Sequence, residues 1–92
     1  MFQVLFLVYV SLMLTEYIAI AMKQATYELL EDNTYYGEIP VCEGVWSNHS
    51  TLEGCRDELQ NTLEGWIILG LQKRHFLPIL NGIDLNLKEK VA

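Results

Sequence analysis

Few side chains in this sequence could perform acid–base or nucleophilic chemistry, and their spacing does not bring them together. His49 and His75 lack a serine or cysteine partner in a catalytic arrangement, which predicts loop or surface positions for both. Asp57 and Glu58 are adjacent carboxylates, but neighbouring residues on a helix point in different directions. The sequence therefore predicts a protein that is not an enzyme.

The two cysteines, Cys42 and Cys55, do not form a C-x-x-C pair. Two cysteines this far apart do not indicate a metal site. Cys55 falls on an apolar helical stripe, where a free thiol packs like a small hydrophobic side chain. We expect both cysteines to be reduced, and we expect neither a metal nor a cofactor.

The distribution of charge favours a basic protein partner. The formal net charge is -6 at pH 7, and between Gln24 and Gln72 nine carboxylates accompany a single basic residue, Arg56. A protein that binds nucleic acid through its phosphates needs the opposite sign, so direct nucleic-acid binding is not expected. An acidic surface attracts a basic partner and accelerates its association. Solubility alone is the competing explanation for this acidity.

The stretch from Ser50 to Leu71 predicts one long amphipathic helix. Ser50 and Glu53 have the spacing of a capping box, in which each side chain satisfies a backbone N–H of the first turn. Apolar residues recur every three or four positions and form one stripe: Leu52, Cys55, Leu59, Leu63, Trp66 and Ile67. A helix with one apolar side needs an apolar surface to pack against.

Short segments on either side of this helix predict that surface, a small antiparallel sheet. Residues 25–30 alternate in polarity, Glu31–Thr34 form a polar turn, and Tyr35–Ile39 form a second strand. Residues 44–47 predict a third strand, and residues 77–80 could add a short fourth one. The predicted fold is α+β with two layers, a three-stranded antiparallel sheet packed on one long helix.

The strand pattern also selects residues for contact with a partner. If Ile39 faces the helix, alternation places Tyr36 and Glu38 on the opposite, exposed face. Aromatic side chains anchor interfaces, so Tyr36 and Trp46 are candidate contacts; for the tyrosine, covering the sheet is the alternative role. The full candidate set also includes acidic residues of the first turn: Glu31, Asp32, Tyr36, Glu38 and Trp46.

The first 21 residues are open to three interpretations. Val4–Leu14 is a nearly unbroken apolar run, and no Lys or Arg precedes Lys23. The segment could be a start-site error before a true initiator at Met22, a secretory signal or membrane anchor, or an extra packed helix. The chain is accordingly divided into three parts: an apolar extension at 1–21, an α+β domain at 22–87 and a tail at 88–92.

The order of these motifs resembles the HicB family of antitoxins from type II toxin–antitoxin systems. The resemblance is carried by the aromatic second strand with its Ile39-Pro40 end, by Gly44-Val45-Trp46, and by the Ser50–Glu53 helix start. It covers residues 27–86. It implies a partial ribonuclease-H-like fold that binds and occludes a small basic HicA-type mRNA ribonuclease toxin, usually as part of a homo-oligomer, in the cytoplasm.

Three features depart from the HicB pattern. His49 stands where the family commonly has glycine, and Gly54 replaces a helix former, which should cost roughly 1 kcal/mol relative to alanine. No residues follow Ala92 for the DNA-binding domain of many relatives, which places autoregulation in doubt and affects toxin binding less. Two other functions stay open: a secreted or membrane-anchored small protein that uses residues 1–21, and an interaction module without a toxin partner.

Overall fold

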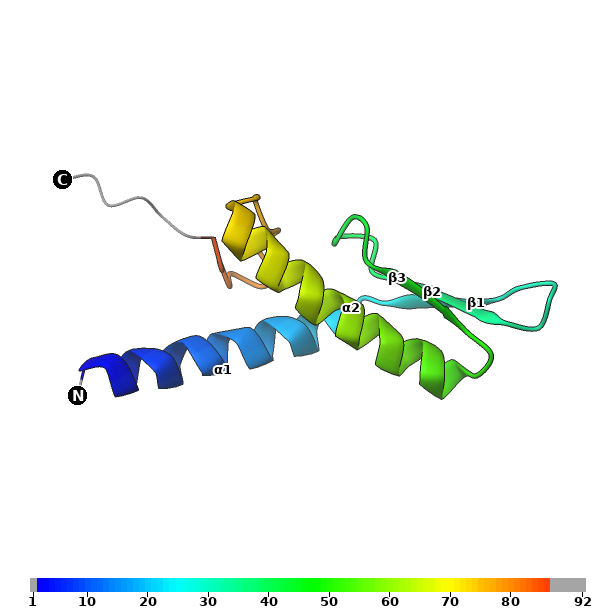
Figure 1. Ribbon diagram of the computed structural model, residues 1–92, viewed down its shortest axis with the longest axis horizontal. Helices are drawn as coiled ribbons and strands as arrows, with labels where there is room; N and C mark the ends of the chain where they lie inside the picture. The colour runs from blue at the N-terminus through cyan, green and yellow to red at the C-terminus, as the bar shows by residue number, and fades with distance from the viewer. Residues whose placement is uncertain (1, 87–92) are drawn as a thin grey trace.

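The computed structural model describes residues 2–86 and contains two helices and a three-stranded antiparallel sheet (Figure 1). The elements follow one another as α1 (Phe2–Lys23), β1 (Thr26–Leu29), β2 (Tyr35–Glu38), β3 (Trp46–His49) and α2 (Leu52–Lys73). α2 lies against one side of the sheet, and the C-terminal half of α1 packs on α2. The predicted α+β fold is confirmed, with α1 as a second helix.

The sheet has the order β1-β2-β3, and each neighbouring pair is antiparallel. The turn between β1 and β2 closes through a hydrogen bond from the N–H of Leu30 to the carbonyl of Thr34, at 2.8 Å. Asn33 has a positive φ of 66° in this turn, a conformation that asparagine tolerates better than most residues. The resulting register fixes which side chains become neighbours across the sheet.

The predicted third strand was misplaced by two residues, since β3 begins at Trp46 and not at Gly44. Gly44 has a φ of 93°, and the N–H of Val45 donates to the carbonyl of Cys42 at 3.0 Å. Both residues therefore belong to the turn that connects β2 to β3. The ladder between these strands starts at the pair Glu38 and Trp46.

The apolar stripe of α2 forms the centre of the core, largely as predicted. Its buried positions are Cys55, Leu59, Leu63, Ile67 and Gly70. The prediction was wrong for Leu52, which is 47% exposed at the first helical position. Trp66 is half-buried and packs against the edge of the core. The helix therefore buries a narrower stripe than its apolar residues suggested.

The N-cap of α2 is Thr51, one residue later than the predicted Ser50. Thr51 has extended backbone angles, and its hydroxyl accepts a hydrogen bond from the N–H of Gly54 at 3.0 Å. Glu53 is consequently the second helical residue and does not stand at the position that completes a capping box. At the other end the helix continues to Lys73, and Arg74 caps it in the left-handed conformation.

Gly37 lets α2 approach the sheet closely. A Cβ atom at this position would lie 2.9 Å from Cδ1 of Tyr27 and 3.0 Å from Sγ of Cys55. Ser47, its neighbour on β3, is also buried and donates a hydrogen bond to the carbonyl of Cys55 at 2.8 Å. A residue without a side chain in the middle of β2 thus positions the helix. Both cysteines are free and buried, as predicted.

The C-terminal half of α1 contributes to the same core. Tyr17 and Ala21, which the sequence analysis assigned to the apolar extension, have no exposed surface. The hydroxyl of Tyr17 donates to the carbonyl of Pro78 at 2.7 Å and so joins α1 to the segment after α2. Among the described residues, no helix combines the length and hydropathy that a membrane span requires.

The segment after α2 is not a strand, and side-chain hydrogen bonds stabilise it in place of strand pairing. The predicted fourth strand at 77–80 is wrong, because Leu80 makes only an isolated bridge with Ile83. The side chain of Asn86 takes the place of a strand partner: it accepts from the N–H of Leu77 at 2.6 Å and donates to its carbonyl at 2.8 Å. The tail predicted at 88–92 lies outside the described residues.

Candidate functional site

The face of the sheet that points away from α2 carries most of the predicted contact residues. We call it the outer sheet face; it consists of Thr26, Glu28, Tyr36, Glu38, Trp46 and Asn48. The opposite face holds Gly37 and Ser47 and is covered by α2. The predicted faces are confirmed, because Ile39 is buried and Tyr36 and Glu38 point to the other side. Tyr36 and Glu38 are, however, half-buried and not exposed as predicted.

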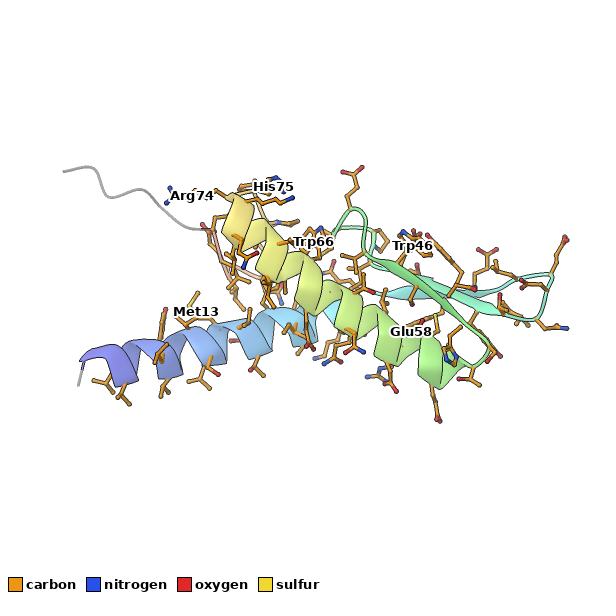
Figure 2. All side chains as sticks on the ribbon, viewed as in Figure 1. Met13, Trp46, Glu58, Trp66, Arg74 and His75 are labelled. Atoms are coloured by element: carbon orange, nitrogen blue, oxygen red, sulfur yellow. The ribbon has the colours of Figure 1, made fainter. Side chains whose placement is uncertain are left out.

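Two aromatic rings form the centre of the outer sheet face. Tyr36 on β2 and Trp46 on β3 are stacked, with ring centroids 6.1 Å apart and an angle of 23° between the ring planes. Trp46 is 55% exposed and projects away from α2 (Figure 2). The stacking fixes both rings before any partner arrives, so binding would not have to order them.

Carboxylates surround the aromatic pair. The Tyr36 hydroxyl donates to Oε2 of Glu38 at 3.2 Å, and Glu28 is paired directly opposite Tyr36 on β1. Partial desolvation raises the pKa of Tyr36, and the hydrogen bond to Glu38 and the negative charges of Glu38 and Glu28 raise it further. Tyr36 therefore stays neutral and keeps its proton as a hydrogen-bond donor.

The two remaining predicted residues lie elsewhere. Glu31 and Asp32 are exposed in the turn between β1 and β2, at the tip of the hairpin and away from the aromatic pair. The Asp32 carboxylate accepts hydrogen bonds from the hydroxyl of Thr34 at 2.6 Å and from its N–H at 3.0 Å, and these bonds lower the pKa of Asp32. Asp32 thus stabilises the turn through bonds within the hairpin.

Two members of the outer sheet face, Glu28 and Asn48, were not predicted from the sequence. Both are cross-strand neighbours of Tyr36. Asn48 donates through Nδ2 to Oγ1 of Thr34 at 2.9 Å and to the carbonyl of Tyr35 at 3.0 Å. That Glu28 and Asn48 lie beside Tyr36 follows only from the register of the strands. The signal for Glu28 was its alternation with Tyr27 and Leu29, which already placed it on the side away from them.

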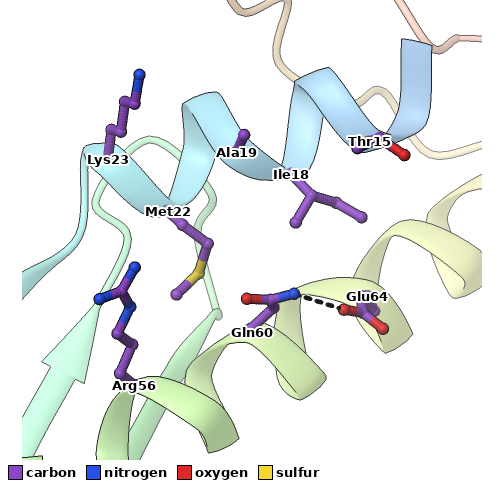
Figure 3. A pocket seen from close by; sticks show the side chains of 8 residues that line it. All are labelled: Thr15, Ile18, Ala19, Met22, Lys23, Arg56, Gln60 and Glu64. Atoms are coloured by element: carbon purple, nitrogen blue, oxygen red, sulfur yellow. Dashed lines mark hydrogen bonds between the residues drawn. The ribbon is translucent and has the colours of Figure 1, made fainter. Parts of the chain in front are cut away.

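A second concave surface lies between the two helices (Figure 3). This α1–α2 groove has a volume of about 590 Å³ and is lined by Thr15, Ile18, Ala19, Met22, Lys23, Arg56, Gln60 and Glu64. Met22 and Ile18 point from α1 toward α2, where Gln60 donates a hydrogen bond to Glu64 at 3.1 Å. A smaller, apolar hollow of about 130 Å³ shares Ile18 and Glu64 with it and extends toward Ile68.

These surfaces offer means of binding. The outer sheet face supplies stacked rings, hydrogen-bond groups and negative charge. The α1–α2 groove supplies a mixed apolar and polar wall. Among the residues that the structure describes, no group of three or more His, Cys, Asp or Glu side chains is placed to hold a metal ion.

Comparison with known proteins agrees with this architecture. A model of the UPF0150-like family matches residues 16–78. This chain belongs to the UPF0150-like family. The crystal structure of TTHA0281 from Thermus thermophilus is 38% identical in sequence and superposes with a TM-score of 0.76, covering 84% of this chain and 96% of TTHA0281. The comparison with curated proteins gave no match.

The bounds of the UPF0150-like match agree with the contacts of the core. The match begins one residue before Tyr17 and ends at Pro78, and these two residues form the hydrogen bond that joins α1 to the C-terminal segment. The last two turns of α1 are therefore part of the UPF0150-like unit. The first turns of α1, up to Thr15, precede the matched range.

Proposed function

We propose that this protein is a HicB-type antitoxin that binds a small basic HicA-type mRNA ribonuclease and occludes its RNA-binding and catalytic surface. The observation that carries the proposal is the outer sheet face, on which Glu28 and Glu38 flank the stacked Tyr36 and Trp46. The UPF0150-like match and the motif resemblance to HicB antitoxins support it. The protein performs no reaction in this proposal, because occlusion is steric and electrostatic.

The chemistry of the outer sheet face suits such a partner. Stacked aromatic rings provide apolar contact area that costs little conformational entropy on binding, which is typical of interface anchors. Negative charge on the same face steers a basic partner toward it and orients it. A ribonuclease that must attract RNA phosphates is basic at its active site, so a surface that fits there also blocks substrate access.

The proposal includes a cytoplasmic location, a homo-oligomeric state and the absence of direct contact with nucleic acid. The net charge of -6 supports the last point, because it repels the phosphate backbone. The function thus requires one macromolecular partner, the toxin, and no cofactor.

The test is a measurement of binding kinetics between this chain and the HicA-type toxin encoded beside it. Tyr36→Ala should raise the dissociation rate roughly thirtyfold, because the loss of an interface anchor costs at least about 2 kcal/mol. The double variant Glu28→Gln, Glu38→Gln should lower the association rate roughly tenfold, mostly at low salt, where charges are least screened. Both variants leave the buried residues of the core intact.

A matched control separates local charge from overall charge. Glu53→Gln with Glu58→Gln removes two charges from exposed positions of α2, on the other layer of the fold, and should change the association rate much less. Glu31→Gln with Asp32→Asn tests the hairpin tip on its own. Binding that is unchanged by the Tyr36 and Glu28–Glu38 variants would place the interface elsewhere. If the toxin does not bind the wild-type chain at all, the proposed function is wrong.

A further inference from the structure

The first three turns of α1 expose an unusual amount of apolar surface. Seven large apolar residues in this segment, which we call the α1 tip, are exposed: Val4, Leu5, Leu7, Val8, Tyr9, Val10 and Leu12. Each of them exposes between 37% and 71% of its surface. Large exposed apolar surfaces are uncommon on soluble monomers and mark sites of interaction.

The outermost residues of the α1 tip repeat at the spacing of a coiled-coil seam. Leu5, Val8 and Leu12 are 71%, 52% and 64% exposed, and they follow one another at steps of three and four residues. Thr15 and Ala19 continue the same spacing and line the α1–α2 groove. One stripe of α1 therefore begins with large exposed side chains and ends with small ones at the edge of a hollow.

We propose that two copies of this chain pair through α1 in antiparallel orientation, so that the α1 tip of each copy fills the α1–α2 groove of the other. Large Leu5 and Val8 of one copy then lie against small Ala19 and Thr15 of the partner, and the reverse contact forms at the same time. Such a two-fold interface uses one patch twice and closes on itself. A stable interface buries about 800 Å² per partner, so this one would have to extend over both the tip and the groove.

Charge favours a second copy in this orientation. Residues 2–15 contain no charged side chain, whereas each chain carries a net charge of -6, so copies repel one another at most other surfaces. A parallel pair would bring the two acidic domains side by side. The antiparallel pair places them at opposite ends of the joined helices.

A lipid surface fits the α1 tip less well. Helices that lie in a membrane interface usually combine an apolar face with a polar face rich in Lys and Arg. The α1 tip has neither a polar face nor a basic residue before Lys23. The groove beside Thr15 and Ala19 would also remain unfilled on a lipid surface. The pairing would supply the homo-oligomeric state that the proposed function includes. Its test needs no toxin, so the pairing and the toxin binding can fail separately.

The test compares the mass in solution of the full chain and two variants by sedimentation equilibrium. The wild type should be a dimer. Ala19→Glu puts a longer, charged side chain at an exposed position where Leu5 of the partner would pack. It should raise the dimer dissociation constant at least about tenfold, because it takes the space of Leu5 and must be desolvated even where Lys23 and Arg56 of the same groove pair with it. Asn61→Glu adds the same charge at an exposed position of α2 outside the groove and should leave the dimer unchanged.

Disulfide formation tests the orientation. A mixture of Leu5→Cys and Ala19→Cys chains should form a mixed disulfide faster than Leu5→Cys forms one with itself. The native Cys42 and Cys55 are buried and do not compete in the folded state. A wild-type monomer, a dimer that Ala19→Glu does not weaken, or faster self-crosslinking of Leu5→Cys overturns the proposal. Flotation of the wild type with phosphatidylcholine vesicles in place of self-association also overturns it.

Discussion

His49 and Gly54 occupy a shared space at the start of α2, and this predicts that their substitutions are coupled. A Cβ atom at Gly54 would overlap the His49 ring, with Cγ at 2.7 Å and the Nδ1 and Cε1 atoms closer still. Nδ1 of the same ring accepts a hydrogen bond from the N–H of Thr51, the N-cap residue, at 3.1 Å. The two departures from the HicB pattern are therefore complementary: glycine at 54 makes room for histidine at 49.

The magnitudes follow from these contacts. Gly54→Ala alone gains up to about 1 kcal/mol of helix propensity. It also displaces the His49 ring and loses the hydrogen bond to Thr51, which costs about 1 kcal/mol. The single substitution should thus be neutral or destabilising. In a His49→Gly background no ring is displaced, and Gly54→Ala should stabilise by about 1 kcal/mol. The expected coupling is therefore about 1–2 kcal/mol, within the range for residues in contact.

Urea unfolding of the wild type, the two single variants and the double variant measures this cycle. Equal slopes of free energy against urea concentration would show that the comparison is of native-state stability. Free energies that add within about 0.5 kcal/mol would refute the shared-space explanation. A full gain of about 1 kcal/mol from Gly54→Ala in the presence of His49 would refute it as well.

Three further predictions concern stability. Trp66→Ala should lower the free energy of urea unfolding by about 1–2 kcal/mol, because the ring is half-buried beside a groove of about 400 Å³. This is less than the roughly 3–5 kcal/mol expected for a fully buried aromatic side chain, and a loss above about 3 kcal/mol would contradict it. A chain that starts at Met22 should have an unfolding free energy lower by at least about 3 kcal/mol, because the core loses Tyr17 and Ala21. An unchanged melting temperature would contradict this. Burial raises the pKa of the Cys42 thiol from 9.0 to about 11, so the folded protein keeps this thiol neutral. The stability that the neutral thiol contributes is complete below pH 9 and is lost as the pH rises to 11. Titration of Cys42 should lower the unfolding free energy by about 2–3 kcal/mol over that interval. Cys42→Ala should remove this part of the loss and leave the part due to Tyr17, whose pKa is also raised by burial.

The elements whose apolar residues recur at a regular spacing could be predicted from the sequence. The elements that depend on contacts between distant residues could not. The alternation of residues 25–39 and the stripe of α2 indicate a sheet covered by a helix, because each pattern has one apolar side. The start of β3 was missed because the hydrogen bonds of its preceding turn continue to Val45. The fourth strand was wrong because the Asn86 side chain, nine residues away, satisfies both backbone groups of Leu77.

The candidate site shows the same division. Alternation alone placed Tyr36 and Glu38 on the exposed face, since the period of a strand is two. The neighbours Glu28 and Asn48 required the register, which is set by the turn around Asn33. The face of α1 that packs on the core could not be identified from the sequence, because large apolar residues occur on every side of its first three turns. The buried side of α1 is apparent only from the structure, in which the Tyr17 hydroxyl donates a hydrogen bond to the carbonyl of Pro78.

The two surfaces proposed for binding lie on different layers of the fold, which decides how they can be used together. The outer sheet face is on the side of the sheet away from α2. The α1–α2 groove lies between α2, which covers the other side of the sheet, and α1, which packs on α2. Pairing of two copies through α1 therefore leaves the outer sheet face, with the half-buried Tyr36 and the exposed Trp46, uncovered in both copies. If both proposals hold, a pair of chains would bind two toxins without competition. The residues that carry each interaction could change independently, because no residue of the outer sheet face lines the groove.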